Sequence, residues 1–261
     1  DGHGVQSAGM MRTCMEYVSQ FDRVAIAHCE VESLTANGVI NEGCASTRLG
    51  MFGWPALGEE LEIIRDIELC RLTGCPLHVA HISTAKGLAY VREAKREGLP
   101  VTCEVTPHHL FLCEDDITND YNTNLKMNPP LRLASDAAAL REGICDGTID
   151  CVVTDHAPHA AHEKQCEWEI AFFGTIGLET SLPLMLTKLV LPKKMSWSRL
   201  VECMAVSPRR ILRLEPVKIE RGSAADLTLI DPAAPVDVTP DYFESKSKNS
   251  AFLGAKLTGA A

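Results

Sequence analysis

Apolar runs and amphipathic stretches alternate along the first 214 residues of the chain. The apolar runs contain few polar residues, which is typical of strands buried on both faces of a parallel sheet. These runs cover residues 23–29, 77–82, 101–106 and 149–154. The amphipathic stretches predict helices over residues 6–21, 59–72, 84–97 and 135–145, the last with Ser135 as its N-cap. This repeated order predicts an α/β fold with a parallel sheet that is covered on both sides.

Turn residues and shorter apolar patterns define the remaining segments. Residues 30–55 are polar and punctuated by glycine, so we expect a loop with one helical turn. Further helices are expected over residues 178–190, 197–205 and 208–214. From residue 215 the pattern changes, because a Gly-Ser turn precedes an expected strand over residues 226–230. We therefore expect an α/β part over residues 1–214 and a small β appendage over residues 215–261.

Composition narrows the class of protein. A chain of 261 residues that is 46% hydrophobic can bury a large core. Its net charge of −10 argues against a nucleic-acid partner, whose phosphates require a basic surface. There is no apolar run of the roughly 20 residues that a membrane-spanning helix needs, and no signal-peptide pattern. Eleven cysteines without a C-x-x-C pair indicate reduced, buried thiols in a cytoplasmic protein. Asp1 in place of an initiator methionine suggests a part of a longer polypeptide.

Candidate metal ligands follow three of the four predicted strands. His28, His81 and Asp155 stand where these strands end, and the C-terminal ends of parallel strands meet at one rim. Neutral imidazoles and a carboxylate are ligands that zinc and similar ions prefer. The alternative is that the histidines are hydrogen-bonded core residues. His78 serves as an internal comparison, because it precedes His81 by three residues and is expected to be such a core residue.

Several sequence strings together resemble the longer bacterial type of dihydroorotase, in the amidohydrolase superfamily. They are AHCE, HVAHIST, CEVTPHHL, KMNPPLR, TDHAPH followed by Lys164, and FGTIGLET. TDHAPH with a lysine five residues further on is highly specific, and the other strings occur in the right order. The resemblance covers nearly the whole chain and matches the C-terminal two-thirds of that family.

This resemblance implies a (β/α)8 barrel with a flanking β domain, and one or two divalent ions, zinc by preference, at the strand ends. The four predicted strands would be the fifth to eighth of the barrel. His28, His81 and Asp155 would bind metal, and Asp1 would bridge two ions from the end of the fourth strand. Related hydantoinase-like enzymes use a carboxylated lysine at that place. Because no lysine lies near Asp1, dihydroorotase is favoured over dihydropyrimidinase, hydantoinase or allantoinase.

The resemblance also assigns substrate contacts to Asn128, to His159 and to the backbone of Phe173 and Gly174. Asn128 offers a donor and an acceptor to a ureido-type edge, and glycine lets backbone approach a flat ring. The alternatives are a turn asparagine, a solvated loop histidine and a helix-entry glycine. Asp155 is interpreted as the carboxylate that carries a proton between an activated water and the leaving nitrogen as N-carbamoyl-L-aspartate and L-dihydroorotate interconvert. His162 and Lys164 are interpreted as loop residues, and His156 is given no role in the site. For His108 and His109 it stays open whether they support the site or only the fold.

One departure from the family limits this interpretation. The His-x-His pair that the family carries on its first strand, with the arginine that follows, is absent from the sequence. Three hypotheses therefore remain open: an active dihydroorotase or related cyclic amidohydrolase, an inactive subunit that scaffolds aspartate carbamoyltransferase, and a plain α/β binding module. A homodimer is expected for the first.

Overall fold

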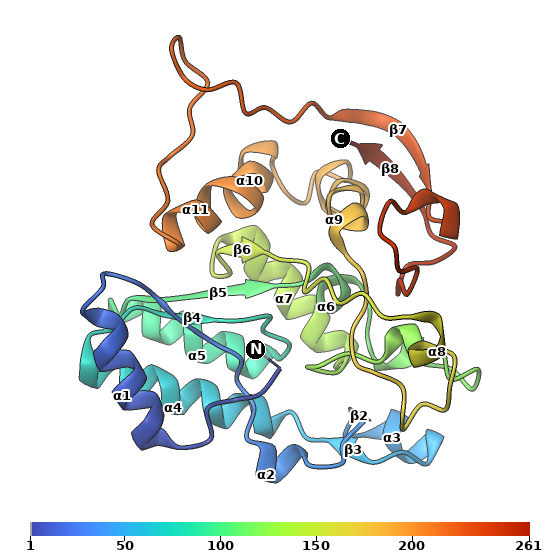
Figure 1. Cartoon of the computed structure of the whole chain (residues 1–261), viewed down its shortest axis with the longest axis horizontal. Coiled ribbons are helices and arrows are strands. Elements are labelled where there is room, and N and C mark those ends of the chain that lie inside the picture. Colours follow the sequence, from blue (N-terminus) through green and yellow to red (C-terminus); the bar gives the residue numbers. More distant parts are fainter. Residues whose placement is uncertain (1) are drawn as a thin grey trace.

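The computed structural model describes residues 2–261, and its centre is a parallel sheet of four short strands (Figure 1). In spatial order the strands are β1 (Ala25–Ala27), β4 (Leu77–Val79), β5 (Val101–Val105) and β6 (Cys151–Val152). All neighbours pair in parallel, with Ala27 opposite Val79 and Val79 opposite Cys103. The four strands predicted from the apolar runs are therefore confirmed. Their order along the chain equals their order in space, as in successive β/α units of a barrel.

Long helices follow or precede these strands and pack against one another in chain order. They are α1 (Ala8–Ser19), α4 (Leu57–Thr73), α5 (Ala85–Arg96) and α7 (Ala134–Asp146). Their apolar faces join the strands in one large buried cluster. Local sequence sets the helix ends, because the side chain of Thr84 accepts from the backbone of Gly87, and Gly74 ends α4 in the left-handed conformation.

The expectation that the sheet is covered on both sides is confirmed for one face only. On the second face, Ile26 is 55% exposed, and its neighbours in register, His78 and Thr102, are hydrogen-bonded to each other. Glu104 also bonds to His78, so His78 is a core residue, as its position suggested. In a closed barrel this face forms the interior, where side chains rather than helices fill the space.

The connections hold more structure than the turn residues indicated. Residues 30–55 contain α2 (Glu32–Thr35), α3 (Cys44–Leu49) and a two-stranded parallel pair, β2 (Ile40–Asn41) with β3 (Gly53–Trp54). The prediction of a loop with one helical turn therefore missed most of the secondary structure of this segment. The N-cap of α7 is Leu133, not Ser135. The helix begins one residue before Ser135, and the side chain of Asp136 accepts from the backbone of Leu133.

Shorter elements complete the chain. They are the helices α6 (Pro107–Phe111), α8 (Ala161–Lys164), α9 (Leu178–Met185), α10 (Trp197–Val201) and α11 (Ser207–Ile211), the 3₁₀ turns Glu114–Asp116, Thr123–Leu125 and Pro240–Tyr242, and the π-helical turns Leu186–Val190 and Glu202–Val206. The π turns continue α9 and α10, so the helices expected over residues 178–190, 197–205 and 208–214 are present. The helix α6 was not predicted.

The expected strand over residues 226–230 does not form. This segment belongs to an extended stretch that projects from the rest of the molecule (Figure 1), with Leu227 and Leu229 58% and 84% exposed. Within residues 2–261 it pairs with no strand, and a strand is stable only with a hydrogen-bonded neighbour. The antiparallel pair instead joins β7 (Asp231–Asp237) to β8 (Lys256–Ala260), which packs on α9. Among residues 2–261, no helix has the length and apolar character to cross a membrane.

A buried acidic pair on α4 gives the fold a pH dependence. The carboxylates of Glu62 and Asp66 are 1% and 0% exposed, and both bond to Arg65. Burial, helped by the neighbouring Asp66, raises the pKa of Glu62 to about 7 despite Arg65. Burial also raises the pKa of Asp66 to about 6. Since the folded state holds these protons more tightly than the unfolded state, their contribution to stability is full below about pH 4 and is lost as the pH rises toward 7.

The substitution Glu62→Gln removes one of these titrations. We expect the free energy of unfolding of the variant to fall less than that of the wild type between pH 5 and 8, by up to about 1.4 kcal/mol per pH unit. Urea denaturation at each pH measures this difference. The matched control is Glu68→Gln, because Glu68 lies on the same helix with a 61% exposed side chain. Parallel pH profiles for wild type and Glu62→Gln would contradict the assignment.

Candidate metal centre and substrate pocket

His28 and His81 meet at the C-terminal rim of the sheet. The first follows β1 by one residue, the second follows β4 by two, and the two strands pair in register. As a result His28 Nδ1 lies 2.9 Å from His81 Nε2, and the rings contact edge to face. Both side chains are buried. The predicted convergence of these two histidines is thus present in the structure.

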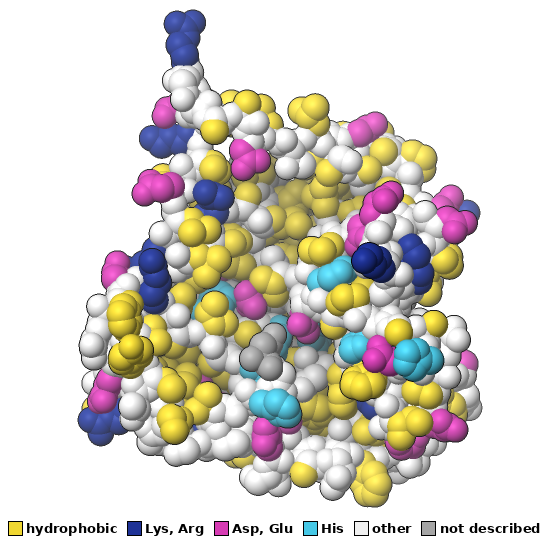
Figure 2. Space-filling model, in the orientation of Figure 1, with side chains coloured by type: hydrophobic (Ala, Val, Ile, Leu, Met, Phe, Trp, Pro, Cys, Tyr) yellow, Lys and Arg dark blue, Asp and Glu magenta, His cyan; other side chains and the backbone are white. Residues whose placement is uncertain are grey.

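Asp155 completes this side of the site from the end of β6. It lines the same two cavities as His28 and His81, each of about 570–580 Å³. Asp155 and His81 both have a left-handed backbone, with φ of 47° and 30°. Residues other than glycine adopt this conformation at a cost, and they occur both in turns and at functional sites. Figure 2 shows histidine and acidic side chains gathered around the hollow in the middle of this face.

The chemistry of these residues fits a divalent ion of the zinc type. Two nitrogens that bind one tetrahedral zinc ion at about 2.0–2.1 Å lie about 3.3 Å apart, within a few tenths of an ångström of the His28–His81 separation. A carboxylate oxygen, as in Asp155, is the usual additional ligand. Among residues 2–261 there is no group of three or more metal-binding side chains already arranged around one point. Asp1, the predicted bridging ligand, lies outside the described residues.

Asn128 enters the pocket from the loop before α7 and is held by Glu30. Asn128 Nδ2 donates to Glu30 Oε2 over 3.3 Å, and the same oxygen lies 3.2 Å from His28 Nε2. Both Glu30 and Asn128 line the cavity that contains His28 and Asp155. Glu30 was not singled out from the sequence, although it belongs to the AHCE string. Its position two residues after His28 was the feature of the sequence that could have identified it.

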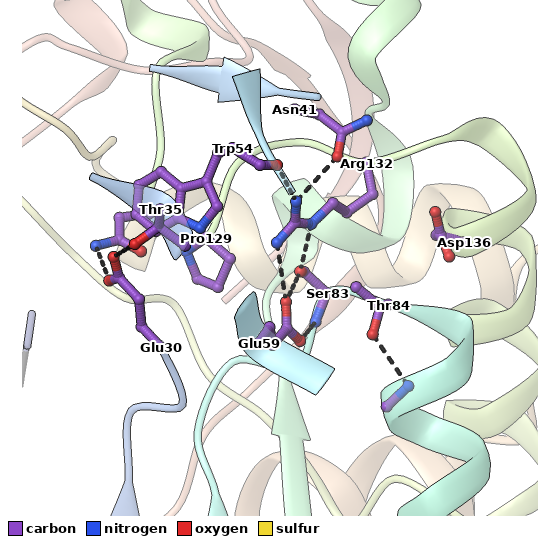
Figure 3. Close-up of polar contacts among 12 residues, drawn as sticks. Glu30, Thr35, Asn41, Trp54, Glu59, Ser83, Thr84, Pro129, Arg132 and Asp136 are labelled. Carbon is purple, nitrogen blue, oxygen red and sulfur yellow. Dashed lines mark hydrogen bonds and ion pairs between the residues drawn. The ribbon is translucent and has the colours of Figure 1, made fainter. Parts of the chain in front are cut away.

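A buried arginine ties the Asn128 loop to the surrounding elements (Figure 3). Arg132 donates to Asn41 Oδ1 and to the carbonyl of Trp54, over 2.9 and 3.0 Å. On its other side it donates to Ser83 Oγ and Glu59 Oε2, over 3.0 and 3.3 Å. The guanidinium therefore links the β2–β3 pair, α4 and the segment between β4 and α5. Arg132 belongs to the KMNPPLR string, but the sequence alone did not indicate a role for it.

His109 supports the same loop. Its Nε2 donates to the carbonyl of Pro129 over 2.9 Å, and its Nδ1 bonds to Thr106 Oγ1 over 2.8 Å. Burial lowers the pKa of His109 to about 3, so the ring is neutral at physiological pH. The sequence left open whether His108 and His109 support the site or only the fold. For His109 the contacts show a structural role beneath the residue that follows Asn128.

Two buried lysines hold the loop that closes the other side of the pocket. Lys126 Nζ donates to three carbonyls within residues 168–171, over 2.7–3.1 Å. Lys164 Nζ donates to the carbonyls of Phe172 and Gly174 over 2.8 and 3.0 Å. Burial lowers the pKa of both lysines to about 8. The interpretation of Lys164 as a loop residue is therefore wrong, because it is buried at the end of α8 and its ammonium organises backbone that lines the pocket.

Phe173 and Gly174 line the cavity with Asn128, where their contact with a substrate stays a prediction, whereas His159 lies behind them. His159 Nε2 donates to the carbonyl of Phe173 over 2.8 Å, and its ring stacks on Phe172. Gly174 has φ of 117°, and a Cβ there would lie 2.5 Å from that of Ala157, so only glycine fits. His159 borders a different cavity, of about 580 Å³. Direct contact of His159 with a substrate stays a prediction.

The two other histidines that follow β6, His156 and His162, do not line the cavity of the candidate metal centre. His156 Nδ1 accepts from the backbone of Gly177 and Leu178 over 3.2 and 3.4 Å, at the start of α9. His162 lies exposed on α8. The interpretation of His162 as a loop residue is wrong, because it lies on a helix, but neither histidine lines that cavity.

The sheet, its rim of histidines and the carboxylate at the end of β6 define a part of an amidohydrolase-type barrel. The L-hydantoinase (dihydropyrimidinase) from Arthrobacter aurescens superposes with a TM-score of 0.87 and 31% identity, over 97% of this chain and 58% of that protein. The D-hydantoinase from Bacillus sp. AR9, 20% identical with a TM-score of 0.84, shares the fold. The predicted fold class is confirmed.

Sequence comparison points to a narrower group. The chain is 48% identical over its full length to a dihydroorotase from Geotalea daltonii, and 47% identical over 99% of its length to one from Carboxydothermus hydrogenoformans. A family model described as dihydro-orotase-like matches residues 1–87. The chain spans about three-fifths of the length of these curated relatives. Its similarity to dihydroorotases, first indicated by short motifs, thus extends over the whole chain.

The Arg132 network yields a prediction of stability. Replacing Arg132 by methionine leaves the buried carboxylate of Glu59 without its cation, so we expect a loss of about 3–5 kcal/mol in the free energy of unfolding. Urea denaturation measures it. The control is Arg12→Met, which removes an exposed pair with Glu16 and should change stability by less than about 1 kcal/mol. Equal effects of the two substitutions would show that the network is not a structural centre.

Proposed function

We propose that this protein is a dihydroorotase, a metal-dependent enzyme that interconverts N-carbamoyl-L-aspartate and L-dihydroorotate in pyrimidine biosynthesis. The observation that carries the proposal is the meeting of His28 and His81 at the strand rim, with Asp155 on the same cavity. The 45–48% identity to curated dihydroorotases along the whole chain supports it. The activity proposed is that of the complete natural polypeptide that contains this chain.

The ligand set of the proposal combines His28, His81 and Asp155 with Asp1 as a bridging group. Divalent ions bound there would supply the acidity that makes water nucleophilic at neutral pH and would polarise the scissile carbonyl. Zinc suits the imidazole and carboxylate donors. The number of ions, one or two, and the bridging role of Asp1 are part of the proposal.

The chain's own residues would bind the substrate and move the proton. Asp155, partly exposed at the cavity wall, would accept a proton at a carboxylate oxygen and return it to the ring nitrogen that leaves. Asn128 would bind the ureido edge of the ring, and Phe173 and Gly174 would cover its face. Closure of the ring in the synthetic direction releases water and uses the same groups in reverse order.

A hydantoinase is the second candidate, because the L-hydantoinase of Arthrobacter aurescens is 31% identical over nearly the whole chain. The two candidates share ring-opening of a cyclic amide but differ in substrate, since only dihydroorotate carries a carboxylate on its ring. A homodimer and an association with aspartate carbamoyltransferase remain predictions for the complete polypeptide.

Substrate and metal dependence can be tested together. We expect the complete polypeptide to hydrolyse dihydroorotate, to act on dihydrouracil and allantoin at least about 10²-fold more slowly, and to lose activity when a chelator removes its metal. Readdition of zinc should restore turnover. Preference for dihydrouracil would favour the hydantoinase alternative. Turnover that a chelator does not change, or no turnover on any of the three, would exclude the proposal.

Asp155→Asn tests the proton-carrying role. Asparagine has nearly the same shape and tolerates the left-handed backbone, but it cannot accept the proton, so we expect turnover to fall by at least about 10²-fold. The free energy of unfolding should change by less than about 1 kcal/mol. The control His162→Asn, on the exposed α8, should retain full activity. A fully active Asp155→Asn enzyme would refute the role.

A further inference from the structure

Glu30 connects a predicted metal ligand to a predicted substrate contact. It lies two residues beyond His28 in the segment after β1, and it is 8% exposed. One carboxylate oxygen, Oε2, lies 3.2 Å from His28 Nε2 and 3.3 Å from Asn128 Nδ2. The other, Oε1, accepts a short hydrogen bond from the hydroxyl of Thr35 (Figure 3). Both oxygens of this buried carboxylate are therefore engaged.

Both oxygens of the Glu30 carboxylate are placed as hydrogen-bond acceptors, since a carboxylate has no donor. Oε1 accepts from the hydroxyl of Thr35, and Oε2 lies within hydrogen-bond distance of His28 Nε2 and Asn128 Nδ2. The contact with Oε2 requires a proton on His28 Nε2, and the lone pair of the ring in its neutral form then lies on Nδ1. That nitrogen is the one that faces His81.

The same oxygen fixes the orientation of the Asn128 amide. Because Glu30 accepts, the amide nitrogen of Asn128 points to it, and the amide oxygen points the other way. Within residues 2–261, this buried Oδ1 has no hydrogen-bond partner. Buried acceptors are usually satisfied, so an unsatisfied one in a cavity wall marks a place for a ligand that donates a hydrogen bond.

We infer that Glu30 is a positioning residue that sets the polarity of two groups at once. It directs the lone pair of His28 Nδ1 toward the metal position, and it presents the carbonyl of Asn128 to the substrate. In enzymes that bind metal through histidine, a carboxylate behind the ring fixes its tautomer and raises its basicity. Here that carboxylate also selects which end of a substrate-binding amide enters the pocket.

The inference rests on the proposed function and narrows the substrate class. A ring that binds opposite Asn128 must present an N–H donor, not a second carbonyl or an alkylated nitrogen. Cyclic imides and ureides with a free ring N–H meet this condition. A substrate alkylated at that nitrogen cannot donate the hydrogen bond and leaves the buried oxygen of Asn128 unsatisfied. We therefore expect such a substrate to bind much more weakly.

The test compares two substitutions of Glu30 in the complete polypeptide. Glu30→Met has nearly the same length but offers no acceptor oxygen, so it releases both His28 and Asn128. Glu30→Gln keeps one carbonyl oxygen that can serve at the Oε2 position while Thr35 reverses its hydroxyl. It is therefore the conservative variant. The matched control is Glu114→Met, because Glu114 is 2% exposed and accepts from the side-chain amide of Asn41, outside the pocket.

Zinc affinity is the first readout and needs no turnover. Competition with a chromophoric chelator measures the dissociation constant of zinc from the metal-depleted protein. We expect Glu30→Met to weaken zinc binding by about 10–100-fold, and Glu30→Gln to restore most of the affinity. Unchanged zinc affinity in Glu30→Met, or an equal loss in Glu114→Met, would overturn the inference.

Ligand discrimination is the second readout. Calorimetry would compare orotate with its two analogues methylated at one ring nitrogen each. We expect the wild type and Glu30→Gln to disfavour one methylated analogue by at least about 10-fold, and Glu30→Met to lose most of this preference. The double substitution of Glu30→Met with Asn128→Ala should discriminate no less than Asn128→Ala alone, because the effect acts through Asn128.

These readouts separate the inference from the function on which it rests. A wild type that binds none of the ring ligands would refute the proposed function, and the zinc measurement would then decide the role of Glu30 at His28 by itself. A wild type that discriminates the methylated ring, with Glu30→Met discriminating equally well, would retain the function and refute the positioning of Asn128.

Discussion

The site depends on the in-register parallel pairing of β1 with β4. Because Ala27 stands opposite Val79, the chain leaves both strands at the same height, and His28 and His81 meet with their ring nitrogens 2.9 Å apart. A shift of one residue would turn one imidazole to the other face of the sheet. The apolar side chains that fix this register therefore also fix the position of the two imidazoles relative to each other. Strand pairing thus determines the geometry of the candidate metal centre.

Buried cations organise the loops around that rim. Lys126 and Lys164 donate to carbonyls of segments that lack regular structure, whereas Arg132 connects β2, β3 and α4. Buried carbonyls outside a helix or sheet need donors, and a long cationic side chain can supply several from one position. The parts of the pocket wall that lack strands and helices consequently keep a defined shape. The cost of burying each charge is offset by these several hydrogen bonds.

The sequence could predict whatever depends on local periodicity. His28, His81 and Asp155 could be identified as candidates, because each stands at the end of an apolar run that is evident in the sequence. The contacts of Arg132 could not be predicted in this way, since its partners lie 49–91 residues distant. The prediction of a strand over residues 226–230 was wrong for a similar reason, because it depends on contacts that are distant in the sequence. Its alternating pattern is suitable for a strand, but a strand needs a neighbour, and pairing is not a local property.

The fold alone does not select the substrate. The L-hydantoinase of Arthrobacter aurescens shares this architecture with a TM-score of 0.87 at 31% identity, so the strands and the rim do not by themselves distinguish the two candidate functions. Selection must therefore come from groups that differ in polarity at fixed positions. The amide of Asn128 is such a group, because reversing it would exchange an acceptor for a donor without moving the backbone. Glu30 prevents this reversal, and its charge thereby connects the histidine that would bind metal to the choice of ring.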